Sequence, residues 1–165
     1  MRTYFKIQRD VHERGHTFDE VMLAIRKREA DCLKFIKPQA AHADLVLSLQ
    51  PIHPQNLLNA NKTNPPRLKL IAKARHGLFE ESLVKVLIGV CGLHVDVYIG
   101  GDNAEVELII EGESSAEDVA LAAHALLPEM EELIDINPKW EEGVKGLIQL
   151  VVLAHIKQTL RRRLI

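Results

Sequence analysis

The chain has 165 residues and a mass of 18.6 kDa, enough for one full hydrophobic core or for a fragment joined to a small domain. Hydrophobic residues make up 47% and charged residues 27%, which are the ordinary proportions of a soluble globular protein. The net charge of −2 and the aromatic content of 4% argue against a nucleic-acid binder or a membrane-surface binder.

Residues 2–14 have the apolar spacing of a helix, with Tyr4, Ile7 and Val11 on one face. Gly15 is placed to end this helix, because glycine readily adopts the left-handed conformation that follows a last turn. The next helix opens after Thr17. Thr17 and Glu20 have the spacing of a capping box. Its predicted buried face holds four residues: Phe18, Val21, Met22 and Ile25.

The first helix carries a group of cations. Lys6 and Arg9 lie on one helical face, and Arg14 stands at the helix end beside the glycine. Such a group suits a phosphorylated ligand, because Arg offers planar forked donors and Lys a compact charge. The alternative is a solvated basic face paired with Asp10 and Glu13, which spacing alone favours.

Residues 31–36 continue as a short helix that Pro38 is expected to interrupt, and residues 44–49 have the composition of a strand. Residues 50–66 then alternate Pro with Asn, which favours turns and extended backbone. We therefore divide the chain into a segment at 1–50, a Pro/Asn-rich linker at 51–66 and a C-terminal module at 67–165.

The C-terminal module is predicted to contain a strand at 67–76, a helix at 78–90 and a hairpin at 95–110, where apolar residues alternate with polar ones. A capping box at 114–117 opens a helix that Pro128 should kink or split. The last helix is expected to begin at Asn137 and Pro138. The fold class predicted for the whole chain is α/β (α+β).

Residues 147–156 form a run that is apolar on nearly every helical face. Such a helix either lies under other elements of its own chain or packs on a second copy, and we expect a homodimer through this segment. The run is too short to span a bilayer, and residues 2–10 lack the apolar core of a signal peptide. Cys32 and Cys91 suit a reducing compartment, so the expected location is cytoplasmic.

Other chemical sites are not apparent in the sequence. The eight histidines form neither H-E-x-x-H nor a Cys/His cluster, so no metal site is predicted. No serine stands in a G-x-S-x-G context, which argues against a hydrolase nucleophile of that kind.

Two blocks of sequence resemble the phosphoribulokinase/uridine kinase family. They are K-x-x-R-D-x-x-x-R-G-H at residues 6–16 and F-I-K-P-Q-A-A-H-A-D-L-V-L at residues 35–47. In that family the first block belongs to a mobile lid over the phosphates, and the second runs into a late strand of the kinase sheet. His16 and the pair at 38–39 are more similar to phosphoribulokinases, and G-L-I-Q at 146–149 is a looser similarity to the C-terminal end of the plant type.

The resemblance implies roles for the cations. Lys6, Arg9 and Arg14 are similar to the residues that hold a sugar phosphate and the transferring phosphoryl group, with His16 as a possible accessory. The full-length enzyme would use ATP and Mg²⁺, with a sugar phosphate as its second substrate.

The chain contains no G-x-x-x-x-G-K-[ST] sequence, the loop that cradles nucleotide phosphates. We therefore expect the nucleotide-binding half to lie before Met1, which would make this chain the C-terminal part of a kinase that is not catalytic by itself. The alternative is a non-catalytic dimerisation or regulatory module derived from the same family.

Overall fold

The computed structural model describes residues 1–55, 65–75, 81–100, 105–129 and 138–163. The chain divides into two compact units, one made of residues 1–43 and 50–67 and the other of residues 44–49 and 68–165. Helices and strands are mixed, which confirms the predicted α/β class. The proposed division at residues 50 and 66 stays a prediction, and residues 56–64 of that linker lie outside the described residues.

The first unit is built from short helical pieces in sequence. They are α1 (Arg2–Ile7), η1 (Gln8–Glu13), α2 (Phe18–Lys27), α3 (Glu29–Asp31), η2 (Cys32–Ile36) and η3 (Lys37–Ala41). The helix predicted at 2–14 is present, but its second half has the wider π-helical turn. The short helix predicted at 31–36 ends at Ile36, before Pro38, as expected, and a 3₁₀ segment follows it. Pro38 stands in the first turn of the 3₁₀ segment, where no intrahelical N–H is required.

The predicted capping box opens α2. The Thr17 N–H donates to Glu20 Oε2 at 2.9 Å, and the Glu20 N–H donates to Thr17 Oγ1 at 3.3 Å. Val21 is buried as expected, but Phe18 is 54% exposed, so its predicted burial is wrong. Among the described residues of this unit only Asp10 and Val21 are buried, because so few elements cannot cover a whole helical face.

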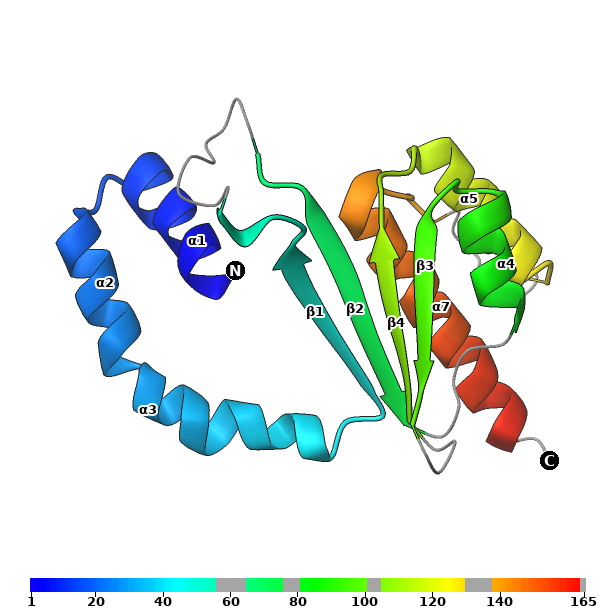
Figure 1. Cartoon of the computed structure of the whole chain (residues 1–165), viewed down its shortest axis with the longest axis horizontal. Coiled ribbons are helices and arrows are strands. Elements are labelled where there is room, and N and C mark those ends of the chain that lie inside the picture. The colour runs from blue at the N-terminus through cyan, green and yellow to red at the C-terminus, as the bar shows by residue number, and fades with distance from the viewer. Residues whose placement is uncertain (56–64, 76–80, 101–104, 130–137, 164–165) are drawn as a thin grey trace. The chain divides into compact units, whose positions relative to one another are not determined.

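The second unit contains a four-stranded sheet. Its strands are β1 (Leu45–Pro51), β2 (Leu68–Arg75), β3 (His94–Ile99) and β4 (Glu105–Glu111), in the order β1-β2-β4-β3 (Figure 1). β4 pairs antiparallel with both β2 and β3. β1 is antiparallel to β2 as well, because the Arg75 N–H donates to the Asp44 carbonyl at one end of the pair and the Ile52 N–H to the Arg67 carbonyl at the other.

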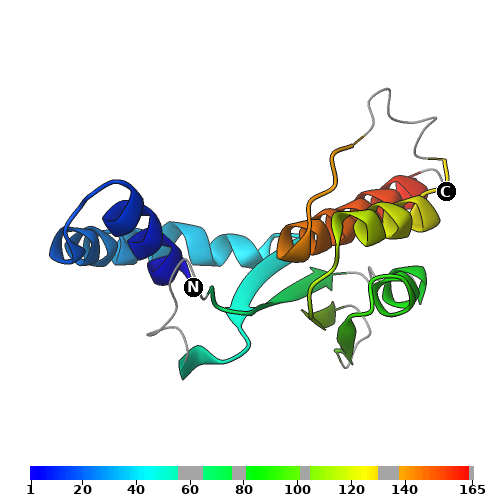
Figure 2. The same ribbon diagram turned by 90° about the horizontal axis from the view of Figure 1, so that it is seen from above.

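Three helices pack on one face of this sheet: α4 (Glu81–Gly89), α5 (Ala116–Leu126) and α7 (Gly143–Arg163). Figure 2 shows α5 and α7 lying side by side over the strands. The core consists of the alternate, inward residues of the strands and one stripe of each helix. Its fully buried large side chains are Leu70, Leu83, Leu87, Leu108, Ile110, Leu126, Leu147, Leu150, Val119 and Val151. The apolar side chains at every second strand residue and those on one stripe of each helix therefore pack together in one layer.

Two predicted helix starts need correction. Ser115, not Ser114, caps α5, since its Oγ accepts the Asp118 N–H at 3.1 Å. The last helix begins at Gly143 rather than at residue 138, because Gly143 adopts φ +60° and a continuous helix cannot pass through that conformation. Asn137 lies outside the described residues. α5 ends at Leu126, before Pro128, and residues 130–137 of the helix predicted beyond this proline lie outside the described residues.

The apolar segment at 147–156 lies within α7 and contributes to the core of its own chain. Leu147, Leu150, Val151 and Ala154 are buried there, whereas Ile156 is 49% exposed. The homodimer expected through this segment stays a prediction. In the described parts of the chain, no helix combines the length and apolarity that crossing a membrane requires.

The sequence G-L-I-Q at 146–149 has a structural explanation. The Gln149 side chain accepts the Glu141 N–H at 2.9 Å and donates to the Lys139 carbonyl at 3.0 Å, so it holds the segment that leads into α7. A β-carbon on Gly146 would lie 2.2 Å from the Glu141 carbonyl oxygen and 2.7 Å from Val119 Cγ2. Only glycine permits this approach.

Gly146→Ala should therefore lower the free energy of unfolding by about 1–3 kcal/mol, the range for overpacked sites. Gly89→Ala is the matched control, because a β-carbon there meets no atom within 4 Å and stability should change by less than about 1 kcal/mol. Urea unfolding followed by circular dichroism measures both variants. Equal midpoints for the two would contradict the close contact at Gly146.

Candidate functional site

The candidate site is formed where η1 turns into α2. The π-helical turn closes with the Arg14 N–H donating to the Arg9 carbonyl at 3.1 Å. Gly15 then adopts φ +72°, and the His16 N–H donates back to the Asp10 carbonyl at 2.9 Å. This local pattern reverses the chain and brings the end of the first helix beside the start of the second.

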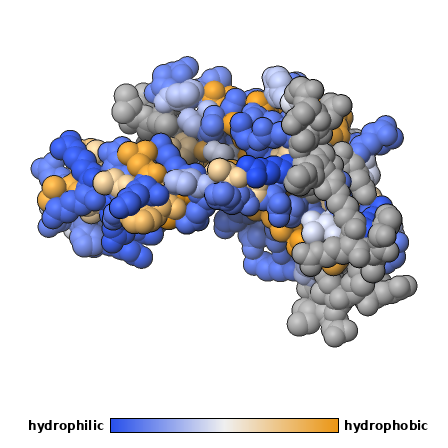
Figure 3. Space-filling view, turned by 90° about the horizontal axis from the view of Figure 1, so that it is seen from below, coloured by the Kyte–Doolittle hydropathy of each residue, from blue (hydrophilic) through white to orange (hydrophobic). Residues whose placement is uncertain are grey.

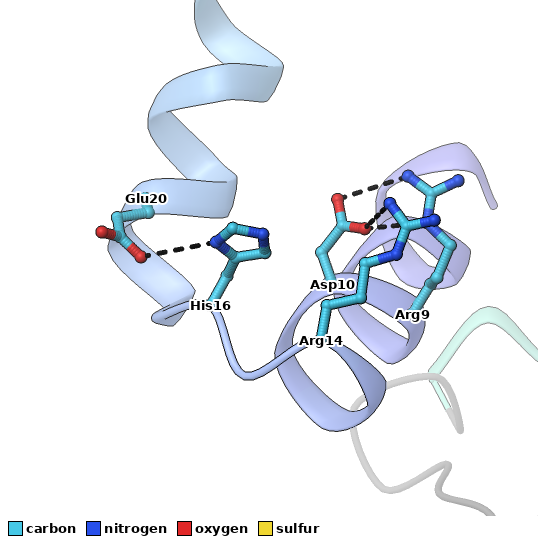
Figure 4. Close-up of polar contacts among 5 residues, drawn as sticks. All are labelled: Arg9, Asp10, Arg14, His16 and Glu20. Atoms are coloured by element: carbon cyan, nitrogen blue, oxygen red, sulfur yellow. Dashed lines mark hydrogen bonds and ion pairs between the residues drawn. The ribbon is translucent and has the colours of Figure 1, made fainter.

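Asp10 is the centre of the cation group (Figure 4). Arg9 binds its carboxylate with two donors, Nε at 2.7 Å from Oδ1 and Nη2 at 3.3 Å from Oδ2. Arg14 reaches the same Oδ1 from the other end of η1, with Nη1 at 3.4 Å. One carboxylate therefore holds two guanidinium groups together.

Burial differs sharply across this group. The Asp10 side chain is 10% exposed, whereas the side chains of Arg9 and Arg14 are 51% and 58% exposed. A guanidinium has five N–H donors, and the bonds to Asp10 use two in Arg9 and one in Arg14. Donors therefore remain on the solvent side, where they can bind the oxygens of an anion.

The hydrogen bonds from Arg9 hold the pKa of the Asp10 carboxyl below its usual range, and the charges of Arg9, Arg14 and Lys6 act in the same direction. A lowered pKa means that the carboxylate stabilises the fold fully above the usual aspartate pKa. That contribution is lost as the pH falls through the lowered pKa. The Arg9 pKa is raised mainly by its hydrogen bond to Asp10, so both partners stay ionised at neutral pH.

A hollow of about 330 Å³ lies beside this group. It is lined by Lys6, Asp10, His16, Glu20, Val21 and Ala24. Figure 4 shows the His16 ring turned toward Glu20, and its Nδ1 lies 3.9 Å from Glu20 Oε2. The backbone N–H of Thr17 holds the pKa of Glu20 below its usual value, so this wall of the hollow is anionic. Lys6, His16 and two carboxylates thus line an open space within one unit, and the two arginines bind one of these carboxylates.

The four residues predicted from the sequence lie close to one another in this arrangement. Lys6 and His16 line the hollow, while Arg9 and Arg14 bind the Asp10 carboxylate that also lines it. Their assignment to a phosphorylated ligand stays a prediction. The pairing with Asp10, which was the alternative explanation, is present too. It does not exclude a ligand, because the arginines use only part of their donors on Asp10.

Sequence reasoning did not assign Glu20, Val21 and Ala24 to this site, although all three line the hollow. The signal was available in part, since the capping box fixes Glu20 in the first turn of α2 and Ala24 lies one turn further on the same face. Among the residues that the structure describes, no group of three or more His, Cys, Asp or Glu side chains could hold a metal ion.

Comparison with known proteins connects this geometry with a family. The model of the phosphoribulokinase/uridine kinase family matches residues 1–55, which include the whole candidate site. The phosphoribulokinase of Synechocystis is 34% identical over 76 residues, which are 46% of this chain and 22% of that protein. The chloroplastic phosphoribulokinase of Triticum aestivum is 39% identical over 69 residues, covering 42% and 17%.

Residues 1–55 are thus similar to the phosphoribulokinase/uridine kinase family. The relatives that this part of the chain resembles are phosphoribulokinases, in agreement with the sequence motifs. The matched part spans about a fifth or less of the curated relatives.

The pairing at Asp10 gives a direct prediction. In an NMR titration of the intact chain, the Asp10 carboxyl should titrate below the usual aspartate range. Arg9→Gln should move its pKa back toward that range, and Arg14→Gln should do so less, because its bond of 3.4 Å is longer than the 2.7 Å bond of Arg9.

Arg26→Gln, which removes a cation from α2, serves as the control and should leave the pKa of Asp10 unchanged. If Arg14→Gln raised the Asp10 pKa more than Arg9→Gln, the assignment of the dominant partner would be wrong.

Proposed function

We propose that this chain is the lid-bearing C-terminal part of a phosphoribulokinase-like kinase, which phosphorylates a sugar phosphate from ATP and is not catalytic by itself. The observation that carries the proposal is the pair of half-exposed arginines held on one buried carboxylate inside the family-matched segment. In the proposed enzyme Arg9, Arg14 and Lys6 bind phosphate oxygens and balance the charge of the phosphoryl group in transfer.

The electrostatics support an anionic ligand. Asp10 is one carboxylate shared by two guanidinium groups, with Lys6 close enough to lower its pKa. The group therefore keeps a positive charge that a phosphate can neutralise. His16 and Glu20 lie across the hollow, where they suit the hydroxyl groups of a sugar as hydrogen-bond partners.

The chain offers less support for binding ATP, the other substrate of the proposed enzyme. ATP and Mg²⁺ belong to the proposed full-length enzyme, but the sequence has no P-loop and the described residues offer no cluster of metal ligands. We therefore assign the nucleotide and its metal ion to the rest of that enzyme, with the three cations of this segment acting on phosphate oxygens only. A cytoplasmic location, in keeping with the free thiols of Cys32 and Cys91, is part of the same proposal.

The surface of the first unit agrees with a role inside a larger protein. Large apolar side chains are exposed along its helical pieces, and Figure 3 shows apolar areas among the polar surface there. These side chains, each about half exposed, are Phe5, Phe18, Leu23, Leu33, Phe35 and Ile36. Apolar surface of this kind is usually covered by further protein.

The second candidate function is a non-catalytic regulatory or dimerisation module derived from the same family. The observation that favours it is the core of the second unit, whose buried residues lie outside the family-matched segment, although Leu45, Leu47 and Leu49 of that segment pack against it. In this case the cation group has no substrate of its own.

A chimera separates the two candidates. Residues 1–55 replace the matching segment of the Synechocystis phosphoribulokinase, and ADP release is measured with ATP and a pentose phosphate. The kinase proposal expects an active chimera in which Arg14→Ala lowers kcat/KM about ten- to a hundredfold, the loss expected for a charge-assisted hydrogen bond of roughly 1.5–3 kcal/mol. Arg26→Ala is the control and should retain the activity of the chimera.

An unchanged kcat/KM in the Arg14→Ala chimera would overturn the assignment of the cations. The intact chain, assayed alone, should release no ADP above the rate without protein. Sugar-phosphate-dependent ADP release from the purified chain would refute its inactivity in isolation.

A further inference from the structure

The hollow beside the cation group has two carboxylates in its walls, and their charges are balanced differently. The Asp10 carboxylate binds Arg9 and Arg14, so two guanidinium groups offset its charge. Glu20 Oε2 instead accepts the backbone N–H of Thr17 at 2.9 Å. A backbone N–H carries no net charge, so the negative charge of Glu20 remains and faces the hollow.

The Glu20 carboxylate is also fixed in position. The capping box joins it to Thr17 in both directions, because the Glu20 N–H donates to Thr17 Oγ1 at 3.3 Å. Figure 4 shows it across the His16 ring from the two arginines. Its side chain is 66% exposed, and the N–H of Thr17 keeps its pKa below the usual value. An ionised, accessible carboxylate is therefore held where it cannot turn away without breaking the cap of α2.

The lining of the hollow suits an uncharged polar group better than an anion. Lys6 contributes one positive charge against the negative charges of Asp10 and Glu20. A volume of about 330 Å³ has room for a small polar molecule. Hydroxyl groups can accept from the Lys6 ammonium and donate to the Glu20 carboxylate, whereas a phosphate there would meet the charge of Glu20.

We propose that Glu20 is a specificity-determining residue, which disfavours ligands that bring a second phosphate into the hollow. The inference rests on the proposed function, because it takes Arg9 and Arg14 as the partners of the first phosphate. The ligand lies with that phosphate at the solvent side of the guanidinium groups and with its hydroxyl-bearing end in the hollow. The doubly phosphorylated product of the proposed reaction is one ligand of the disfavoured kind. Glu20 thus weakens the binding of product relative to that of substrate.

An NMR titration of the intact chain tests this role. The amide signals of residues 6–20 are followed with a pentose monophosphate and, separately, with a pentose bisphosphate. Glu20→Gln removes the charge but keeps the side-chain oxygen that a capping box needs. This variant should bind the bisphosphate about three- to tenfold more tightly than the wild type, with nearly unchanged binding of the monophosphate, because only the second phosphate meets the carboxylate.

Asp19→Asn is the matched control. It removes the same charge from the same turn of α2, but among the described residues Asp19 is not part of the lining of the hollow. Its effect on the Kd of the bisphosphate should be less than about twofold. The gain in Glu20→Gln should also shrink as NaCl is added, because salt screens an exposed charge. A change caused only by an altered helix cap would not follow the salt concentration in this way.

The outcomes separate this inference from the proposed function. Monophosphate binding that is absent, or that Arg14→Ala leaves unchanged, would overturn the assignment of the cations and this inference with it. If Arg14→Ala weakens monophosphate binding but Glu20→Gln leaves the Kd of the bisphosphate unchanged, only the role of Glu20 is refuted. An equal gain in Asp19→Asn would refute that role as well, since it would show a general effect of charge on α2.

Discussion

The pairing of β2 with β4 is the interaction on which the second unit depends. In this ladder Leu70 lies opposite Ile110 and Ala72 opposite Leu108, so every second residue of both strands points to the same side. All four are fully buried, and the helices must cover that side to keep them so. The other side carries cross-strand ion pairs instead, such as Lys69 with Glu111. The apolar face of the sheet thus decides on which side the helices lie.

Most elements of this unit could be predicted because their periods are strict. Alternation over 67–76 and 95–110 specified the strands, and helical spacing specified α4 and α5. The errors lie at the ends of helices, where the conformation or the hydrogen bonds of a single residue decide where the helix begins. Ser115 caps α5 because its hydroxyl, not that of Ser114, reaches Asp118. The start of α7 is set by the positive φ of Gly143, which composition does not reveal.

The candidate site was predictable in its residues but not in its arrangement. The cations at 6, 9 and 14 are visible in the sequence, as is the neighbouring carboxylate of Asp10. An ideal helix would also bring Arg14 near Asp10, since four residues separate them. That Asp10 is buried and shared by two arginines depends on the π-helical turn, which the apolar spacing of the sequence does not reveal, and on the tertiary contact with α2. Ion pairing and ligand binding therefore looked like alternatives when they are compatible.

A shared carboxylate explains how three cations can stand close together. Arg9 and Arg14 repel each other, and Asp10 offsets that repulsion while leaving part of each guanidinium in water. The two arginines are thereby fixed before a ligand arrives, so less side-chain entropy is lost on binding. The negative charge of Asp10 also lowers the net positive charge of the group by one, which weakens its attraction for an anion. In the proposed kinase, the site would thus exchange some affinity for fixed geometry. Fixed geometry suits the transfer of a phosphoryl group, because most of the catalysis of that reaction is positioning.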